Sequence, residues 1–585
     1  MIKFFHLLLF ISMLSVQSVR AENITMDHPS PYVRMHASDA VKWQKWDSSV
    51  LLRAQKENKL IMISSGYFAC HWCHVMRRES FTDAEIAALL NSRYIPVKID
   101  RELNSSLDAY LMGFLQRTQH RGGWPLNVFL TPEGYPLTGL VYLPPKRFKD
   151  VLFRLDTRWQ ADSAGLNKKA ADAFEYAQNS GQESVYVSND QLASALLNML
   201  SQVTDDLQGG FGDGAKFPMP YLMMSLIGRY EKKPDKQLAE FIRLTLQQMA
   251  TKGLHDVVGG GFFRYTVDQG WQLPHFEKML YTNAAMIELY VKAYEVFNDR
   301  RWLIVAEETV DFVIREMQGQ NGFYVSSLNA QDASGEEGGN YTWDKKELLS
   351  AIKKFNNQKI IDGTEYHAMP GSEKVLPVGL WAGQISEKNR RRLWQKRIEN
   401  PPVKDDKLLL SWNAYLLSSM VNLIKVSDKK QTVNAARALY KNIKAQTGSD
   451  LLRNRQGHAQ RYLEDYVFVA NALYQWNKLQ KSDVDRKLIS SLVMRTLTLF
   501  ADDNGWNMTD KPVIPMPASQ KNIKDANLPS AEVVLVRLLY ELKPGHSEVK
   551  KIIRRISQQV DVRVANNPLE YSSLIDFKLE YKLDL

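Results

Sequence analysis

Short apolar runs alternate with amphipathic segments through the first third of the chain. The apolar runs, which are typical of buried strands, are residues 60–64, 94–99, 126–130 and 137–143. A Thr131–Gly134 turn signal separates the last two, so they are expected to form a hairpin. The amphipathic segments predict helices over residues 48–59, 82–90 and 103–116, the second opened by a Thr82–Glu85 capping box. This alternation predicts a layered α/β domain.

Helical periodicity dominates from about residue 188 onward. The predicted helices lie near residues 189–203, 219–231, 236–252, 283–297, 301–317, 344–355, 411–426, 432–445, 465–478, 485–500, 530–542 and 547–559. Loops rich in glycine and aromatic residues separate several of them, as at 209–212, 259–263 and 321–324. An α/α toroid and an irregular helical array both fit this pattern, and periodicity alone does not choose between them.

The first 21 residues have the features of a secretory signal peptide. Lys3 gives a positive start, Phe4 to Val16 is mostly apolar, and Val19-Arg20-Ala21 fits a cleavage site. The apolar run is shorter than the roughly 20 residues that a membrane span needs. We therefore expect a secreted or periplasmic protein with no stable membrane span after cleavage. A retained N-terminal anchor is the alternative.

Composition narrows the class of protein. Hydrophobic residues make up 44% and charged residues 24% of the 585 residues, which excludes a mainly disordered chain. The formal net charge is +10, but the basic residues are scattered outside any glycine-aromatic context suited to base stacking. We therefore predict no nucleic-acid partner. Only two cysteines are present, which excludes a disulfide framework and a four-cysteine metal site.

Those two cysteines form a Cys-x-x-Cys motif, Cys70-His71-Trp72-Cys73, which follows the predicted strand 60–64 and begins a predicted helix. The free N–H groups and dipole of a helix N-terminus stabilise a thiolate. Cys70 would then be the attacking thiol and Cys73 the resolving one, and a protonated His71 would stabilise the thiolate further. A c-type haem attachment site, a metal site that includes His71 or His74, and a structural disulfide are the alternatives.

A Trp124-Pro125 pair directly precedes the predicted strand 126–130. Thioredoxin-fold proteins place a cis-proline at this point, against the Cys-x-x-Cys motif, so a cis bond is expected here. The predicted catalytic set is therefore Cys70, Cys73, His71, Trp124 and Pro125. We expect it to use no cofactor and no metal.

Many short motifs, spread in order along the chain, carry a family resemblance. They include Ser30-Pro31-Tyr32, Gly66-Tyr67, Cys70 to Met76, Lys98 to Glu102, Gly122 to Leu126, Gly209 to Gly212, Lys216 to Pro218, Pro274 to Met279, Ser411 to Asn413 and Leu463 to Tyr466. This series resembles the spermatogenesis-associated protein 20 family. The resemblance implies a thioredoxin-like domain, residues 22–185, followed by residues 186–585 as an (α/α)6 toroid of the kind seen in six-hairpin glycosidases and N-acylglucosamine epimerases. The chain departs from the family pattern at Asn329 and over residues 525–532.

The implied toroid suggests a second site. Glycosidases need two carboxylates, epimerases of this shape use histidines as acid and base, and aromatic rings stack on sugars. The candidate substrate-binding residues are His275, Glu277, Asp256, Trp271, Trp412, Glu464 and Asp465. Packing, helix capping and pairing with arginines are the alternative roles for these residues.

Two functional hypotheses follow. In the first, the chain is an exported thiol–disulfide oxidoreductase that needs an external redox partner or a substrate protein with thiols or a disulfide, and the toroid is a platform for substrate or partner. In the second, the toroid acts on or binds carbohydrate, and the thioredoxin-like domain is accessory. A haem protein is a third and weaker hypothesis.

Overall fold

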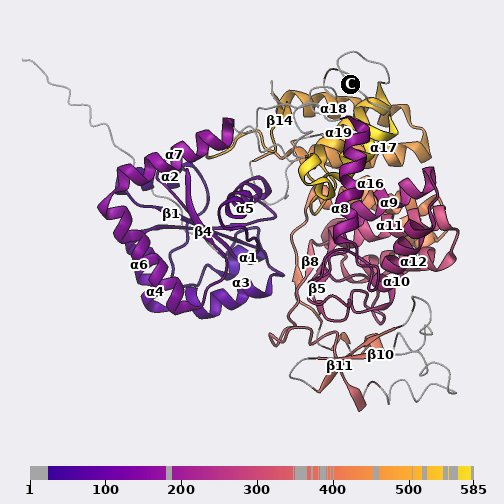
Figure 1. Ribbon diagram of the computed structural model, residues 1–585, viewed down its shortest axis with the longest axis horizontal. Coiled ribbons are helices and arrows are strands. Elements are labelled where there is room, and N and C mark those ends of the chain that lie inside the picture. The colour runs from indigo at the N-terminus through magenta and orange to yellow at the C-terminus, as the bar shows by residue number, and fades with distance from the viewer. Residues whose placement is uncertain are drawn as a thin grey trace, which may run out of the picture.

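The computed structural model describes residues 24–581, except residues 25, 180–187, 347, 349–364, 370–372, 380, 382–390, 392, 396, 400, 449, 452–459, 503–504, 517–522, 544–550 and 552–563. A sheet-containing N-terminal domain lies beside a larger helical domain (Figure 1). The predicted signal peptide and the predicted boundary at residues 185 and 186 lie outside the described residues. Among the helices that are described, none has the length and hydropathy of a membrane span.

A four-stranded mixed sheet forms the centre of the N-terminal domain, in the order β2-β1-β3-β4. Its strands are β1 (Ile61–Gly66), β2 (Ile95–Asp100), β3 (Leu126–Leu130) and β4 (Pro136–Leu140). β1 and β2 run parallel, whereas β3 is antiparallel to both β1 and β4. Gly66 pairs with Asp100, so the two parallel strands end at the same edge of the sheet.

Helices cover both faces of this sheet. They are α1 (Pro31–Met35), α2 (Ser48–Glu57), α3 (His71–Met76) with the π-helical turn η1 (Arg77–Phe81), α4 (Ala84–Arg93), α5 (Ser105–Gln119), α6 (Pro145–Ala161) and α7 (Ser163–Asn179). Because strand side chains alternate, Ile61 and Ile63 join the buried cluster of α2 and α5, whereas Met62 joins that of α4 and α6. The predicted α/β domain is confirmed.

One local prediction in this domain was wrong. The helix predicted from Thr82 begins instead after Asp83, whose carboxylate accepts hydrogen bonds from the N–H groups of Glu85 and Ile86. Thr82 belongs to the preceding turn, and its hydroxyl donates to the carbonyl of Arg78. Helices α6 and α7 were not predicted at all.

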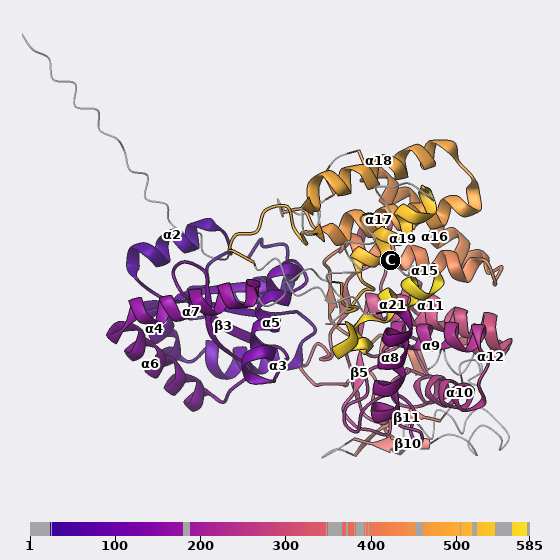
Figure 2. The same cartoon turned by 45° about the horizontal axis from the view of Figure 1, so that its top comes forward.

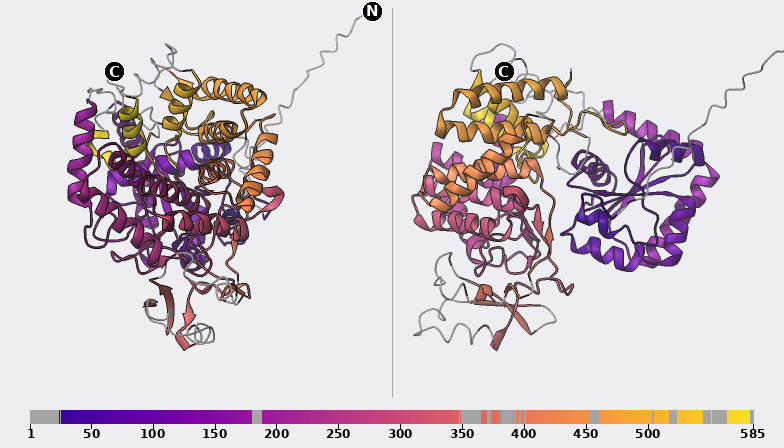
Figure 3. Two further views of the ribbon diagram at one scale, coloured as in Figure 1. Left: turned by 90° about the vertical axis from the view of Figure 1, so that its right-hand side faces the viewer. Right: turned by 180° about the vertical axis from the view of Figure 1, so that it is seen from behind.

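The helical domain is a closed ring within the described residues. Its inner helices are α9 (Pro220–Lys232), α11 (Leu280–Phe297), α15 (Leu410–Ile424), α17 (Leu463–Gln480), α19 (Ala531–Leu542) and α21 (Ser572–Glu580). Each packs against the next, and α21 packs back against α9. This closure confirms the (α/α)6 toroid and decides against an irregular array. Figure 2 and the left view of Figure 3, which looks onto the helical domain with the α/β domain behind it, show the same helices.

An outer layer surrounds the ring. It contains α8 (Asn189–Val203), α10 (Lys236–Thr251), α12 (Arg300–Glu316), α16 (Lys430–Ala445) and α18 (Asp483–Phe500). The burial of the two layers differs as expected for a toroid, since α15 is buried almost all round, whereas α16 buries one stripe, Thr432, Ala436, Leu439 and Ile443. The predicted helices at 344–355 and 547–559 fall mostly outside the described residues.

Short strands connect the ring helices. They are β5 (Tyr265–Thr266), β6 (Pro274–His275), β7 (Lys278–Met279), β8 (Ser327–Leu328), β9 (Trp343–Asp344), β10 (Glu365–Ala368), β11 (Lys374–Val378), β12 (Lys404–Asp405), β13 (Ala501–Asp502) and β14 (Gly505–Trp506), with single helical turns η2 (Gln320–Gly322) and η4 (Pro568–Tyr571). β7, β8 and β12 form one sheet, and β5 pairs with β6. The loops around β5 and β8 face the side of the N-terminal domain that carries α3 (Figures 1 and 2).

Candidate redox site at the domain interface

A disulfide joins Cys70 and Cys73, whose Cα atoms lie 5.3 Å apart. β1 ends at Gly66, and the next residues carry the chain to Cys70, which is the N-cap residue of α3. The N–H group of Cys73 donates to the Cys70 sulfur at 3.2 Å. This amide is available to stabilise negative charge on Cys70 when the disulfide is reduced. Among the described residues, no group of three or more His, Cys, Asp or Glu side chains is arranged to hold a metal ion.

The Trp124–Pro125 bond is cis, as predicted. It directly precedes Leu126, which pairs with Ser65 on β1, so it lies at the same edge of the sheet as the disulfide. The Trp124 indole donates to Asp108 at 2.9 Å, and the Arg101 guanidinium lies 3.8 Å from the centroid of the Trp124 ring. Trp124 is therefore held between the end of β2 and the start of α5.

The disulfide is buried, and the residues beside it contact the helical domain. Cys70 is 3% exposed and Cys73 is 1% exposed, although Trp72 between them is 48% exposed. The Nδ1 atom of His71 lies 3.2 Å from the Gln331 side-chain nitrogen and 3.3 Å from a Glu337 carboxylate oxygen, both in the helical domain. Burial lowers the pKa of His71 against the opposing charge of Glu337, which favours the neutral form of the ring.

Two of the predicted toroid residues lie at this contact. His275 is 6.2 Å from His71 between ring centroids, and its Nδ1 atom lies 3.3 Å from Glu277. The Tyr67 hydroxyl, three residues before Cys70, donates to Glu277 at 2.9 Å. Arg264 donates to the same hydroxyl and to Glu277. Two of the residues predicted for a toroid site therefore contact the thioredoxin-like domain.

A buried charged cluster forms a further contact between the domains. The Lys407 ammonium group lies near three carboxylates, those of Asp405 at 2.5 Å, Asp100 at 2.7 Å and Glu102 at 3.0 Å. Burial, with the charges of Asp100 and Asp405, raises the pKa of Glu102 to about 7 against the opposing charge of Lys407. One cation among three buried carboxylates favours retention of a proton by the cluster near neutral pH.

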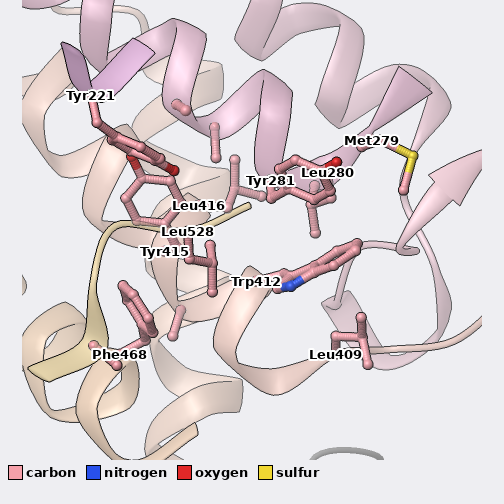
Figure 4. Packing of buried hydrophobic residues seen from close by; sticks show 14 of the residues in the cluster. Tyr221, Met279, Leu280, Tyr281, Leu409, Trp412, Tyr415, Leu416, Phe468 and Leu528 are labelled. Atoms are coloured by element: carbon pink, nitrogen blue, oxygen red, sulfur yellow. The ribbon is translucent and has the colours of Figure 1, made fainter. Parts of the chain in front are cut away.

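A cavity of about 90 Å³ lies between the two domains. The N-terminal domain contributes Arg101, Glu102, Ser105, Asp108 and Ala109, and the helical domain contributes Trp412, Glu464, Met508, Lys524 and Ala526 to Ala531. Trp412 lies beside Tyr281, their ring centroids 4.8 Å apart (Figure 4). The cavity therefore brings Trp412 and Glu464, two predicted toroid residues, together with charged residues of the thioredoxin-like domain.

The other three predicted toroid residues form structural contacts. Although burial opposes it, Arg397 and Lys278 hold the pKa of Asp256 well below its usual value, through contacts of 2.6 and 2.7 Å. Trp271 is fully buried, and its indole donates to the Gln208 carbonyl at 3.0 Å. Asp465 accepts from the N–H group of Ser411 at 3.0 Å.

Comparison with known proteins agrees with this architecture. The sequence profile of the Thioredox_DsbH family, described as "Protein of unknown function, DUF255", matches residues 22–178. Spermatogenesis-associated protein 20 of Mus musculus is 34% identical over 350 residues, which is 56% of this chain and 44% of that protein. The Homo sapiens protein of the same name is 28% identical over 607 residues, which is 90% of this chain and 77% of that protein. The match thus spans less than half the length of the mouse protein.

The resemblance to the spermatogenesis-associated protein 20 family is confirmed. A solved structure, cellobiose 2-epimerase from Spirochaeta thermophila DSM 6192, is similar with a TM-score of 0.41 and 13% identity, covering 65% of this chain and 84% of that one.

The positions where this chain departs from the spermatogenesis-associated protein 20 pattern have structural contacts. Asn329 accepts from the N–H group of Gln331, which in turn contacts His71. Asp525 accepts from the N–H groups of Ser530 and Ser573 and so holds the segment before α19 to the start of α21.

Sequence reasoning missed most of the interface. Tyr67, Arg101, Glu102 and Asp108 were not predicted as site residues, although the charged run that begins at Asp100 directly after an apolar strand is a local signal. Lys407 has no local signal, because its partner Asp100 is 307 residues away in the chain.

Proposed function

We propose that this chain is an exported thiol–disulfide oxidoreductase whose Cys70–Cys73 pair exchanges with external thiols or disulfides. The observation that carries the proposal is the disulfide at the start of α3, beside a cis Trp124–Pro125 bond, in a thioredoxin-like sheet. The signal-like residues 1–21 support export into an oxidising compartment.

The chemistry follows from the positions of the two sulfurs. In the reduced state, the Cys70 thiolate attacks a substrate disulfide, forms a mixed disulfide and releases the first substrate thiolate. The Cys73 thiol then loses its proton to solvent and attacks the Cys70 sulfur, which releases the second substrate thiolate and restores the intramolecular disulfide. Two electrons pass from the cysteine pair to the substrate.

Access to this pair is limited by the helical domain. Both sulfurs are buried, and the bond from Tyr67 to Glu277 closes the interface three residues before Cys70. The exposed Trp72, whose ring lies 5.0 Å from that of Tyr142, marks the open edge of the site. We therefore expect small thiols to enter at this edge and protein substrates to require partial opening of the interface.

The direct test is exchange of the purified full chain with glutathione disulfide after reduction. We expect the wild type to form the intramolecular disulfide with release of glutathione, Cys73→Ser to stop at the mixed disulfide, and Cys70→Ser to lose exchange. Exchange that persists unchanged in Cys70→Ser would contradict the proposal.

A matched pair of variants tests the role of the interface. Tyr67→Phe removes a hydroxyl bond to a carboxylate across the interface, a contribution of about 1.5–3 kcal/mol, so we expect exchange with a protein disulfide substrate, which requires the interface to open, to accelerate about tenfold or more. Tyr440→Phe removes a similar bond, to Asp485, between two outer helices of the toroid and should leave the rate unchanged. Equal rates in both variants would show that access does not depend on this contact.

A second candidate function rests on the cavity between the domains. Trp412 offers an aromatic ring, and Glu464, Arg101 and Lys524 offer polar groups, to a small polar ligand such as a sugar. Calorimetric titration with glucose, mannose and cellobiose tests this. Binding should disappear in Trp412→Ala and persist in Trp72→Ala, which changes an exposed tryptophan outside the cavity. The absence of heat with all three sugars would contradict it.

A further inference from the structure

Tyr32 lies on α1, two residues after its N-cap residue Ser30, and its side chain is fully buried. Its hydroxyl has no hydrogen-bond partner among the described residues. A buried hydroxyl without a partner is unfavourable and uncommon, since most such groups are paired. The groups around the Tyr32 hydroxyl therefore indicate which partner it could bind.

The Cys73 sulfur and the Tyr32 hydroxyl both lie beside Gly66. A Cβ atom placed on Gly66 would lie under 3.0 Å from both the Tyr32 hydroxyl and the Cys73 sulfur, which is 2.7 Å from that point. Both groups therefore lie near the same point, beside a residue that has no side chain. Glycine at position 66, the last residue of β1, leaves the space that lets them approach.

The protonation state of Tyr32 makes it a donor. Burial, followed by the charges of Asp100, Asp39 and Asp108, raises the pKa of Tyr32 well above its usual value. The phenol therefore stays protonated near neutral pH and has a hydrogen to give. In the disulfide-bonded state the Cys73 sulfur carries no charge, whereas in the reduced state it becomes a thiolate before it attacks Cys70.

We propose that the Tyr32 hydroxyl donates a hydrogen bond to the Cys73 thiolate when the cysteine pair is reduced, and so eases the resolving step. This inference rests on the proposed exchange function of the pair. Tyr32 transfers no proton: the Cys73 proton passes to solvent, the sulfur attacks Cys70, and the substrate thiolate leaves. Its unpartnered state in the oxidised protein is then a consequence of the missing anion.

The position of Tyr32 is fixed from the domain interface. The Ser30 hydroxyl donates to Asp100 at 2.5 Å, and Asp100 lies 2.7 Å from Lys407 of the helical domain. Ser30 also caps α1 by accepting from the N–H group of Val33. A chain of polar contacts therefore runs from the toroid to the helix that holds the hydroxyl beside Cys73.

Other charged groups lie near Tyr32 and Cys73, and their effects on the Cys73 pKa must be distinguished from that of the hydroxyl. Besides the carboxylates of Asp39, Asp100 and Asp108, the Lys98 ammonium group lies near Tyr32, 5.0 Å from its ring centroid. Burial lowers the pKa of Lys98 to about 7. On α3, His71 and His74 flank Cys73, and burial lowers the pKa of both. All of these groups remain in Tyr32→Phe, so the comparison with the parent isolates the hydroxyl.

The test measures the pKa of Cys73 in the full chain with Cys70→Ser, where Cys73 is the only thiol, by thiolate absorbance across pH. We expect Tyr32→Phe to raise this pKa by about one unit or more, since hydrogen bonds to charged groups have that strength. The control, Tyr94→Phe, removes a buried hydroxyl that donates to Leu152 at the opposite end of β2, and the pKa should not change. An unchanged Cys73 pKa in Tyr32→Phe would overturn the proposal.

Stability provides an independent measurement. Removing an unpartnered hydroxyl is expected to leave the oxidised protein as stable as before or more so, whereas the reduced protein at a pH above the Cys73 pKa should lose stability. Equal effects in both redox states would also overturn the proposal. These measurements need no turnover, so they stay informative even if the wild type shows no exchange with glutathione, which would count against the proposed function alone.

Discussion

Glu102 gives the sharpest prediction about the domain interface. Its carboxylate lies 3.0 Å from Lys407, but Asp100 and Asp405 share the same cation, and burial raises the pKa of Glu102 from 4.5 to about 7. The folded protein therefore binds more protons than the unfolded chain between these two values. Because of this difference, the free energy of unfolding falls as pH rises through the window, by about 3 kcal/mol in total.

Glu102→Gln removes that titration and leaves the other three groups in place. We expect the variant to match the wild type near pH 4.5 and to become more stable than it by up to about 3 kcal/mol above pH 7. Urea unfolding at fixed ionic strength from pH 4.5 to 8 measures the difference. Glu85→Gln, which removes an exposed carboxylate paired with Lys149, should stay within about 0.5 kcal/mol of the wild type throughout. A Glu102→Gln difference that does not change with pH would refute the reasoning.

The remaining predictions concern stability. Lys407→Met leaves three buried carboxylates without their cation, so we expect a loss of about 3–5 kcal/mol and faster proteolysis between the domains, and wild-type resistance would contradict it. Gly66→Ala places a Cβ against Tyr32 and Cys73 and should destabilise by about 1–3 kcal/mol in urea unfolding, whereas Gly214→Ala, where a Cβ meets nothing within 4 Å, should not. Asp256→Asn leaves Lys278 and Arg397 without their shared carboxylate and should lower stability by about 3–5 kcal/mol without changing sugar binding, and lost binding in a stable variant would instead favour a ligand role.

Local signals were sufficient for the sheet and for the Cys-x-x-Cys motif. The four strands could be predicted because each is largely buried and contains a short apolar run, and Cys70, Cys73 and the cis-proline lie close to those runs in the chain. Helix α6 was missed because its buried stripe, Phe148, Leu152, Asp156 and Trp159, includes a carboxylate that interrupts the apolar period. The start of α4 was misplaced because Thr82 and Asp83 are both good cap residues, and only the preceding π-helical turn decides between them.

The interface could not be predicted by the same means. Glu277 looks like a catalytic carboxylate in a glycine- and aromatic-rich loop, but its partner Tyr67 is 210 residues away. Periodicity predicts the ring helices but not which helices pack against each other. Closure of the ring therefore could not be predicted from it. Residues that form a site only when two domains pack together are far apart in the chain, so no sequence spacing identifies them.

The positions of the interface contacts relate the two functional hypotheses. Tyr67 precedes Cys70 by three residues, His71 follows it directly, and Asp100 pairs with Gly66 at the end of β1. Tyr67, His71 and Asp100 also contact the toroid. The same short segments therefore position the disulfide and bind the helical domain. Separating the domains therefore removes contacts from the same residues that surround the sulfurs, and the free energy of docking adds to the barrier for any exchange that needs opening. A ligand in the cavity would contact Arg101 and Asp108, which hold Trp124, and by linkage would shift the same equilibrium.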